Sequence, residues 1–332
     1  MSNTTQALSR IEAILDDSSF VEIGAAVTAR ATDFNMQEKK APSDGVITGY
    51  GVVNGNLVYV YSQDAAVLGG TIGEMHAKKI ASLYEKAMKM GAPVIGLIDC
   101  AGLRLQEATD ALNGFGEIYK NMSLASGIIP QITAVYGECG GGLAVLAELS
   151  DFVFVEEKKA KLFVNSPNAL DGNYESKLDT SSAKFMEEAG VADFVGDEET
   201  IANGVRQLVS MLPSNNTEGT VCTDNQDDLN RVCADMAAEI ADPALALTDI
   251  SDDGVFVETK AEYAKEMVTG FILVDGVTVG AVANRTALYD ENGEKAEEFA
   301  PVLTTAGAYK AAEFVTFCNA FEIPVLTLTN VK

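Results

Sequence analysis

Two segments of this 332-residue chain place small residues where a buried strand gives way to a loop or a helix. The first is residues 99–107 (DCAGLRLQE), and the second is residues 132–146 (ITAVYGECGGGLAVL), a predicted strand, glycine-rich turn and helix. Such turns leave backbone N–H groups without acceptors, and glycine removes the Cβ that would block a ligand. Together the two loops could form an oxyanion hole for charge developing on a carbonyl oxygen, although tight packing alone would also explain Gly140–Gly142.

Side chains that usually act as catalysts are scarce. His76 is the single histidine, and at the start of a predicted helix it is interpreted as structural, with a general base as the alternative. Cys100 and Cys139 lie in the two loops and are interpreted as small packing residues, with nucleophilic thiols as the alternative. Asp99 and Glu107 are interpreted as structural or helix-capping. A single histidine cannot supply the usual set of metal ligands, so no metal is expected. The chain also has no Gly-x-Ser-x-Gly or phosphate-loop pattern, so the remaining chemistry depends on backbone N–H groups.

The elements that must position these loops repeat along the chain. Each copy has a hairpin with a two-residue turn, Asn54-Gly55 in one and Asp275-Gly276 in the other, and these residue pairs accept positive φ. A helix follows, and then a short apolar strand opened by proline. The predicted hairpins cover 49–60 and 270–280. The predicted helices cover 73–90 and 308–321, and the predicted strands cover 93–98 and 324–328. The repeat predicts an α/β fold with a duplicated ββα unit, and therefore two related lobes.

The repeat also predicts the domain organisation. Residues 1–212 form a first lobe, residues 213–260 an acidic linker, and residues 261–332 the beginning of a second lobe. The linker has eleven acidic residues against two basic ones, and it is predicted to contain a connecting helix over 227–240. The second lobe stops just after its matching strand, so we expect it to be incomplete.

Composition excludes several classes of protein. The chain has 23 Lys and Arg against 49 Asp and Glu, a net charge of −26, and such a surface repels the phosphates of nucleic acids. No apolar run approaches the ~20 residues that span a bilayer, and the first residues are polar, so we expect a cytoplasmic protein. The five scattered cysteines fit neither a disulfide framework nor a zinc ribbon.

Several segments of the chain resemble one family of enzymes. They are RIEAILDDSSFVE (10–22), SDGVITGYG (43–51), GGTIGEMHAKKI (69–80), GAPVIGL (91–97), ASGIIPQI (125–132) and the second hairpin with its flank (270–284). In combination they resemble the carboxyltransferase component of biotin-dependent acyl-CoA enzymes, the family of the propionyl-CoA carboxylase β subunits and the methylmalonyl-CoA decarboxylase α subunits. The resemblance covers nearly the whole chain.

The resemblance implies a crotonase-like (ClpP-like) ββα spiral in each lobe. It implies transfer of a carboxyl group between biotin, held by a separate biotin carboxyl carrier protein, and the α-carbon of a short-chain acyl-CoA, with propionyl- or methylmalonyl-CoA expected. It further implies that the thioester binds in the first lobe and that biotin approaches from the second lobe of another subunit, so a homo-oligomer is expected. A biotin carboxylase or a membrane decarboxylase subunit is a further expected partner, and the direction of transfer stays open.

The resemblance also implies roles for individual residues. Gly141 and Gly142 would donate hydrogen bonds to the thioester oxygen. The other substrate-binding residues that it implies are Gly69, Gly70, Thr71, Ala101, Gly102, Arg104 and Gly140. Leu103, Glu138 and Leu143 depart from the family pattern and leave the acyl group open. The biotin-side oxyanion loop would follow residues 324–328, so we expect this chain to hold a thioester without completing the transfer.

Two alternative functions stay open from the residues alone. A crotonase-type decarboxylase or hydratase without biotin would need a side-chain acid or base beside the thioester, for which Glu107 and Glu138 are the candidates. A non-catalytic CoA-binding subunit would bind CoA and assemble without turnover.

Overall fold

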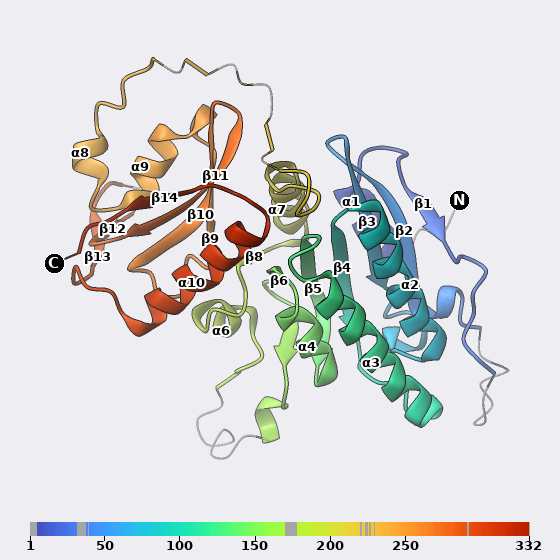
Figure 1. Ribbon diagram of the computed structural model, residues 1–332. Coiled ribbons are helices and arrows are strands. Elements are labelled where there is room, and N and C mark those ends of the chain that lie inside the picture. Colours follow the sequence, from blue (N-terminus) through green and yellow to red (C-terminus); the bar gives the residue numbers. More distant parts are fainter. Residues whose placement is uncertain are drawn as a thin grey trace. The chain divides into compact units, whose positions relative to one another are not determined.

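The computed structural model describes residues 5–331 except 32–37, 39, 170–177, 220, 223, 224, 226, 229 and 291. The chain divides into two compact units, the first combining residues 1–186 with 194–210 and the second combining residues 187–193 with 211–332 (Figure 1). Each unit has its own main sheet. None of the helices in the described part is both long enough and apolar enough to span a membrane.

The sheet of the first unit has eight strands. They are β1 (Val21–Ile23), β2 (Val46–Val53), β3 (Asn56–Gln63), β4 (Val94–Cys100), β5 (Gln131–Gly140), β6 (Phe152–Glu156), β7 (Lys161–Phe163) and β8 (Phe194–Gly196). Their order is β1-β2-β3-β4-β5-β6-β8, and β7 pairs with β5. The pairs β1–β2 and β2–β3 are antiparallel, and every pairing from β3 onward is parallel. Because parallel strands end at the same edge, the loops after β3, β4 and β5 come together.

Helices flank this sheet. They are α1 (Gln6–Ile14), α2 (Glu74–Met90), α3 (Ala108–Ala125), α4 (Gly142–Glu148) and α7 (Glu198–Met211), with short 3-10 turns at Ser43–Gly45, Leu68–Gly70, Leu105–Glu107 and Pro167–Ala169. A further short helix, α6 (Ala183–Glu188), crosses the boundary between the two units. Helix α2 packs against α3 and against β2 and β3, and α2, α3 and α4 lie in front of the sheet in Figure 1. The first five residues of β4 are all buried, which explains why this strand reads as a continuous apolar run.

The elements predicted for the first copy are confirmed. Val53 pairs with Asn56 across the hairpin, and the turn residues Asn54 (φ 49°) and Gly55 (φ 87°) both have positive φ. Helix α2 begins after Gly73 and ends at Gly91, which adopts the left-handed conformation (φ 63°) that glycine allows at a helix end.

The second unit repeats this arrangement. Its main sheet has the order β14-β11-β10-β9, formed by β9 (Phe256–Thr259), β10 (Met267–Val274), β11 (Val277–Asn284) and β14 (Val325–Leu328). Strands β10 and β11 form the second hairpin, α10 (Thr305–Ala320) follows, and β14 joins β11 in parallel as β4 joins β3. The predicted duplication is therefore confirmed. The extra residues of this copy form a separate hairpin, β12 (Ala287–Tyr289) with β13 (Lys295–Glu298).

The stretch expected to be a linker contributes to the second unit. Helix α9 (Pro243–Ile250) places Leu247 in a core with Val268 and Ile272, and β9 pairs with β10. The helix predicted over 227–240 is wrong, because the only helical part described there is α8 (Met236–Glu239). The reason is local. The Asp227 and Asp228 carboxylates accept backbone N–H groups of the residues that follow, which replaces the hydrogen bonds of a helix.

The duplication includes a buried lysine in each copy. Lys79 of α2 and Lys310 of α10 each lie five residues after the first residue of their helix. The Lys79 amine donates to the carbonyls of Ser43 (3.0 Å) and Val46, at the start of β2. The Lys310 amine donates to the carbonyls of Lys260 (2.7 Å) and Tyr263 (2.9 Å), shortly before β10. Burial lowers the pKa of each amine to about 8. Each lysine ties its helix to the segment that leads into its hairpin.

Candidate functional site

Two of the expected substrate loops are joined by backbone hydrogen bonds. The Ala101 N–H donates to the Gly69 carbonyl at 2.9 Å, and the Ile72 N–H donates to the Gly102 carbonyl at 2.9 Å. The Arg104 N–H then donates to the Ile72 carbonyl at 3.0 Å. The loop after β3 and the loop after β4 therefore form one platform, and the structure brings together the expected residues Gly69–Thr71 and Ala101–Arg104.

Glycines in this platform have two different roles. Gly70 (φ 63°) is buried, and a Cβ there would lie 2.4 Å from the Asp99 carbonyl oxygen, so the two loops could not approach so closely with any other residue. Gly102 (φ 106°) faces open space, because nothing lies within 4 Å of the position of a Cβ. Gly70 is needed for packing, and the missing Cβ of Gly102 leaves open space beside the loop.

The third expected loop lies beside this platform. Cys139 of β5 is paired with Cys100 of β4, so the glycines after β5 border the loop after β4. Gly141 has φ 62° and ψ −124°, a conformation suited to glycine, and its missing Cβ also leaves open space. A Cβ on Gly140 would lie 2.6 Å from the Phe163 ring, so Gly140 serves packing.

The N–H groups of this loop differ in availability. The Gly141 N–H already donates to the Phe163 carbonyl at 2.8 Å. The N–H groups of Gly142 and Leu143 have no acceptor among the described residues, as expected in the first turn of a helix. The Tyr119 hydroxyl donates to the Gly142 carbonyl at 2.6 Å and fixes that peptide. The geometry thus differs from the expectation for Gly141, and the available donors are those of Gly142 and Leu143.

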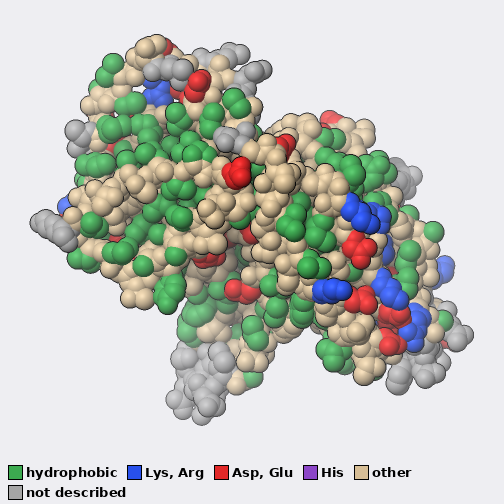
Figure 2. All heavy atoms as spheres, viewed as in Figure 1, with side chains coloured by type: hydrophobic (Ala, Val, Ile, Leu, Met, Phe, Trp, Pro, Cys, Tyr) green, Lys and Arg blue, Asp and Glu red, His purple; other side chains and the backbone are tan. Residues whose placement is uncertain are grey.

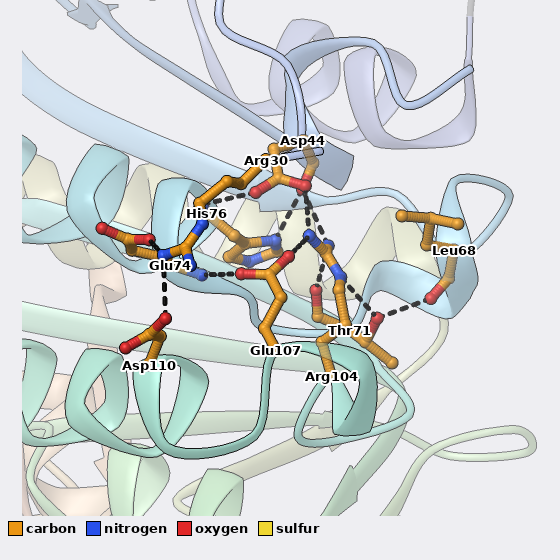
Figure 3. A network of polar contacts seen from close by, with 9 residues as sticks. All are labelled: Arg30, Asp44, Leu68, Thr71, Glu74, His76, Arg104, Glu107 and Asp110. Carbon is orange, nitrogen blue, oxygen red and sulfur yellow. Dashed lines mark hydrogen bonds and ion pairs between the residues drawn. The ribbon is translucent and has the colours of Figure 1, made fainter. Parts of the chain in front are cut away.

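Arg104 lies beneath the platform. Its side chain is 1% exposed, and it pairs with the carboxylates of Asp44 and Glu107, the latter at 3.0 Å (Figure 3). It also donates to the Thr71 carbonyl (Nη2, 2.6 Å) and to the Thr71 hydroxyl (Nε, 3.3 Å). The Thr71 hydroxyl in turn donates to the Leu68 carbonyl at 2.7 Å. Arg104 was expected to bind substrate. In this geometry its buried guanidinium bonds to Thr71 and so links the loop after β4 to the loop after β3.

Two carboxylates complete the start of α2. A Glu107 oxygen accepts the Glu74 N–H at 2.6 Å, and an Asp44 oxygen accepts the His76 N–H at 2.8 Å. Negative charge is favourable there because the first N–H groups of a helix lack partners. The interpretation of Glu107 as a capping residue is confirmed. Both of its oxygens are engaged, so it is poorly suited to act as a general acid.

An outer cluster of charges joins α2 to α3. Arg30 pairs with Glu74 of α2 and with Asp110 of α3, the latter at 2.8 Å (Figure 3). On the face shown in Figure 2, Lys and Arg side chains over these helices lie among Asp and Glu side chains. This part of the surface is therefore of mixed charge although the whole chain is acidic.

His76 is a structural residue, as interpreted from the sequence. Its side chain is buried, with Nδ1 at 2.9 Å from the Asp44 carbonyl and Nε2 at 3.1 Å from the Gln63 amide nitrogen. A proton on Nδ1 satisfies both contacts, because Nε2 then accepts from the Gln63 amide. Burial is the main cause that lowers the pKa of His76 to about 3. A neutral, enclosed imidazole does not serve as a general base for a bound substrate.

The other candidate side chains are also engaged or buried. Burial raises the pKa of the Cys100 thiol to about 12 and raises that of Cys139 still further, so neither is a nucleophile. Asp99 forms an ion pair with Arg10 at 2.8 Å. Glu138 is exposed. In the described part of the chain, no group of His, Cys, Asp and Glu has the arrangement of a metal site.

Sequence reasoning missed three residues of this site. Asp44, Gln63 and Tyr119 were not candidates, because none lies in a glycine-rich loop. The signal for Asp44 was its position in SDGVITGYG, a segment used only for the family resemblance. Gln63 and Tyr119 gave no signal in a single sequence, because their roles depend on contacts with residues 13 and 23 positions away.

Known proteins share both sequence and fold with the chain. A family model described as carboxyl transferase domain matches residues 2–332. The chain is 40% identical to the propionyl-CoA carboxylase beta chain of Roseobacter denitrificans, over 98% of this chain and 64% of that protein. It is 36% identical to the methylmalonyl-CoA decarboxylase subunit alpha of Propionigenium modestum, over 98% of this chain and 63% of that protein. It therefore spans less than two thirds of the length of these relatives.

A solved structure is also similar. One chain of the transcarboxylase 12S structure, which was solved as a hexamer assembly with hydrolysed methylmalonyl-coenzyme A bound, superimposes with a TM-score of 0.88 at 32% identity, over 98% of this chain and 63% of that one. This likeness confirms the predicted α/β, crotonase-like fold.

Proposed function

Because the chain belongs to the carboxyl transferase domain family, we propose that it moves a carboxyl group between biotin and the α-carbon of a short-chain acyl-CoA. Propionyl- and methylmalonyl-CoA are the proposed substrates, since the relatives at 40% and 36% identity are named for them. The observation that carries the proposal is the loop after β5, where the Gly142 and Leu143 N–H groups have no acceptor among the described residues, beside a glycine whose missing Cβ leaves open space.

In this proposal the thioester carbonyl oxygen accepts hydrogen bonds from Gly142 and Leu143. Charge develops on that oxygen when the α-carbon gains or loses its carboxyl group, so donors fixed in advance lower the barrier. Removing one such donor costs about 10²–10³-fold in rate in enzymes that use them. Biotin on its carrier protein would supply or accept the carboxyl group, and the biotin ureido nitrogen that loses the carboxyl group would take up the proton displaced from the α-carbon, so no side-chain base is required. In the reverse direction that proton would return to the α-carbon. We assign no residue to biotin.

We propose that the chain acts within a larger assembly. One similar structure was solved as a hexamer forming a multienzyme core. The partners we propose are further copies of this chain, a biotin carboxyl carrier protein, and either a biotin carboxylase or a membrane decarboxylase subunit, depending on the direction of transfer.

The biotin-independent alternative is less well supported. It needs a free carboxylic acid beside the thioester, and both Glu107 oxygens are occupied by Arg104 and the Glu74 N–H. Glu138 is the remaining candidate, and it is exposed. Replacing it (Glu138→Gln) is expected to leave activity unchanged, and a loss of activity would favour this alternative.

The first test is the stability of the chain with acetyl-, propionyl- and methylmalonyl-CoA, compared with free CoA. A ligand at ~100-fold over its Kd adds about 2.7 kcal/mol of stability. We expect propionyl- or methylmalonyl-CoA to stabilise the chain more than free CoA does. Equal stabilisation by free CoA would instead support a CoA-binding subunit, and no stabilisation by any thioester would contradict the proposal. Transfer of labelled carboxyl to a biotin carrier protein, measured on the assembly rather than on this chain alone, then tests the reaction.

A further inference from the structure

The segment before β2 has an unusual backbone. Three consecutive residues, Ser43 (φ 52°), Asp44 (φ 52°) and Gly45 (φ 72°), adopt the left-handed conformation. Only the last is a glycine; aspartate tolerates this conformation better than most residues do, whereas serine disfavours it. The Asp44 side chain is fully buried. A strained backbone with a buried carboxylate persists only where the surrounding contacts hold it in place, and such positions cluster at functional sites.

The contacts of Asp44 reach two of the elements that shape the thioester site. Its carboxylate pairs with Arg104 through one oxygen and accepts the His76 N–H at 2.8 Å through the other. Its carbonyl lies 2.9 Å from His76 Nδ1 and 3.5 Å from Arg104 Nη2 (Figure 3). One residue thus contacts the end of the loop after β4 and the first turn of α2.

We propose that Asp44 is a positioning residue of the thioester site. It orients the Arg104 guanidinium, and Arg104 holds the Thr71 carbonyl and hydroxyl, so Asp44 sets the platform on which the acyl end of the substrate lies. This inference rests on the proposed function. The inference extends the proposed function, because Asp44 touches no substrate. Asp44 would affect recognition of the acyl group without affecting recognition of the rest of CoA.

The test is the variant Asp44→Asn. Asparagine tolerates the left-handed conformation, so the backbone is retained while the charge opposite Arg104 is removed. Asp242→Asn is a matched control. Asp242 is also buried and also pairs with a buried arginine, Arg285, at 2.7 Å, and that arginine likewise contacts a second carboxylate, Glu258, at 3.2 Å, but all three lie in the second unit.

The measurement is the affinity of wild type and both variants for propionyl-CoA, methylmalonyl-CoA and free CoA by calorimetry, with the unfolding temperature alongside. Both variants are expected to unfold at lower temperature. Only Asp44→Asn is expected to lower the ratio of thioester affinity to CoA affinity, by about tenfold. An unchanged ratio, or an equal fall in Asp242→Asn, would overturn the inference. If wild type itself binds no thioester in preference to CoA, it is the proposed function that fails.

A second variant covers the case in which Asp44→Asn does not fold. Asp44→Glu keeps the ion pair with Arg104 but displaces the carboxylate by one methylene group. The added methylene group at a buried, left-handed position is expected to lower its unfolding temperature as well. Its affinities are therefore measured at a temperature where it is folded, the same affinity ratio is expected to fall, and a ratio equal to that of wild type would overturn the inference.

Discussion

At the scale of single residues, the site depends on the absence of a Cβ atom at two glycines as well as on the side chains that are present. Gly102 and Gly141 leave open space where other residues have a Cβ. The titratable groups nearby, Arg104, Glu107 and His76, are buried and hold the loops in place. In the proposed function the chemistry therefore falls to peptide N–H groups, and the side chains serve positioning.

Replacing Gly141 with alanine tests the backbone requirement. The new methyl group meets nothing within 4 Å, so the cost comes from the conformation (φ 62°, ψ −124°) alone. We expect Gly141→Ala to lower the free energy of unfolding by about 1–3 kcal/mol and to weaken thioester binding. Gly116→Ala in α3 is the control, because that glycine also faces open space but has helical backbone, and it is expected to gain about 0.5–1 kcal/mol. Equal stability of the two variants in urea unfolding would contradict the prediction.

The buried imidazole predicts a pH dependence of stability. The pKa of His76 is about 3 in the fold and near 6.5 when unfolded, so only the unfolded chain binds this proton between those values. The contribution of the neutral His76 side chain to the free energy of unfolding is fully present above pH 6.5. It is lost as the pH falls toward 3, at about 1.4 kcal/mol per pH unit. Urea unfolding of wild type and His76→Gln from pH 5 to 8 measures it. The difference between the two curves should change below pH 6.5, and a constant difference would show that His76 titrates normally.

At the scale of elements, helix α3 fixes the loop that carries the available donors. The Tyr119 hydroxyl reaches the Gly142 carbonyl, and a Cβ on Gly142 would lie 2.7 Å from that hydroxyl. Helix α3 and the first turn of α4 are thus held in close contact.

Removing this hydroxyl is expected to loosen the donor loop. Tyr119→Phe loses one hydrogen bond, worth about 1 kcal/mol, so thioester affinity should fall about fivefold while the fold is kept. Tyr309→Phe is the control, because that side chain is 70% exposed on α10. The prediction fails if calorimetry gives the same thioester affinity for both variants.

The elements that the sequence predicted well are those with local signals. The two hairpins are specified by Asn54-Gly55 and Asp275-Gly276, and α2 by its apolar stripe and Gly91. The helix over 227–240 was wrong because side-chain oxygens of two aspartates compete locally with a helix. The site was predictable as loops but not in its contacts. That Gly141 is engaged with Phe163, and that Asp44 holds Arg104, depends on residues distant in sequence.

At the scale of the whole molecule, the duplication preserves one polar contact as well as the topology. Lys79 and Lys310 occupy the same position in α2 and α10 and donate to carbonyls of the segment before the hairpin. Each is buried, and each lies in its own unit.

This arrangement predicts independent contributions to stability. Lys79→Met and Lys310→Met each leave two buried or part-buried carbonyls without their charged donor, so each should cost about 2–3 kcal/mol. Since the lysines share no partner, the double variant should show the sum to within about 0.5 kcal/mol. Urea unfolding of the four proteins measures this, and a departure of more than about 1 kcal/mol would show that the two anchors are coupled.

The buried state of the loop thiols and of the single imidazole bears on how the protein can be inhibited. Reagents that alkylate cysteine or acylate histidine find no accessible target at Cys100, Cys139 or His76, whereas Cys222 is exposed and open to labelling. Such reagents would therefore modify the exposed Cys222 and leave the loop after β5 unmodified. Under the proposed function, an effective inhibitor of this site would instead be a stable anion with the shape of a thioester enolate, competing for the peptide N–H groups themselves.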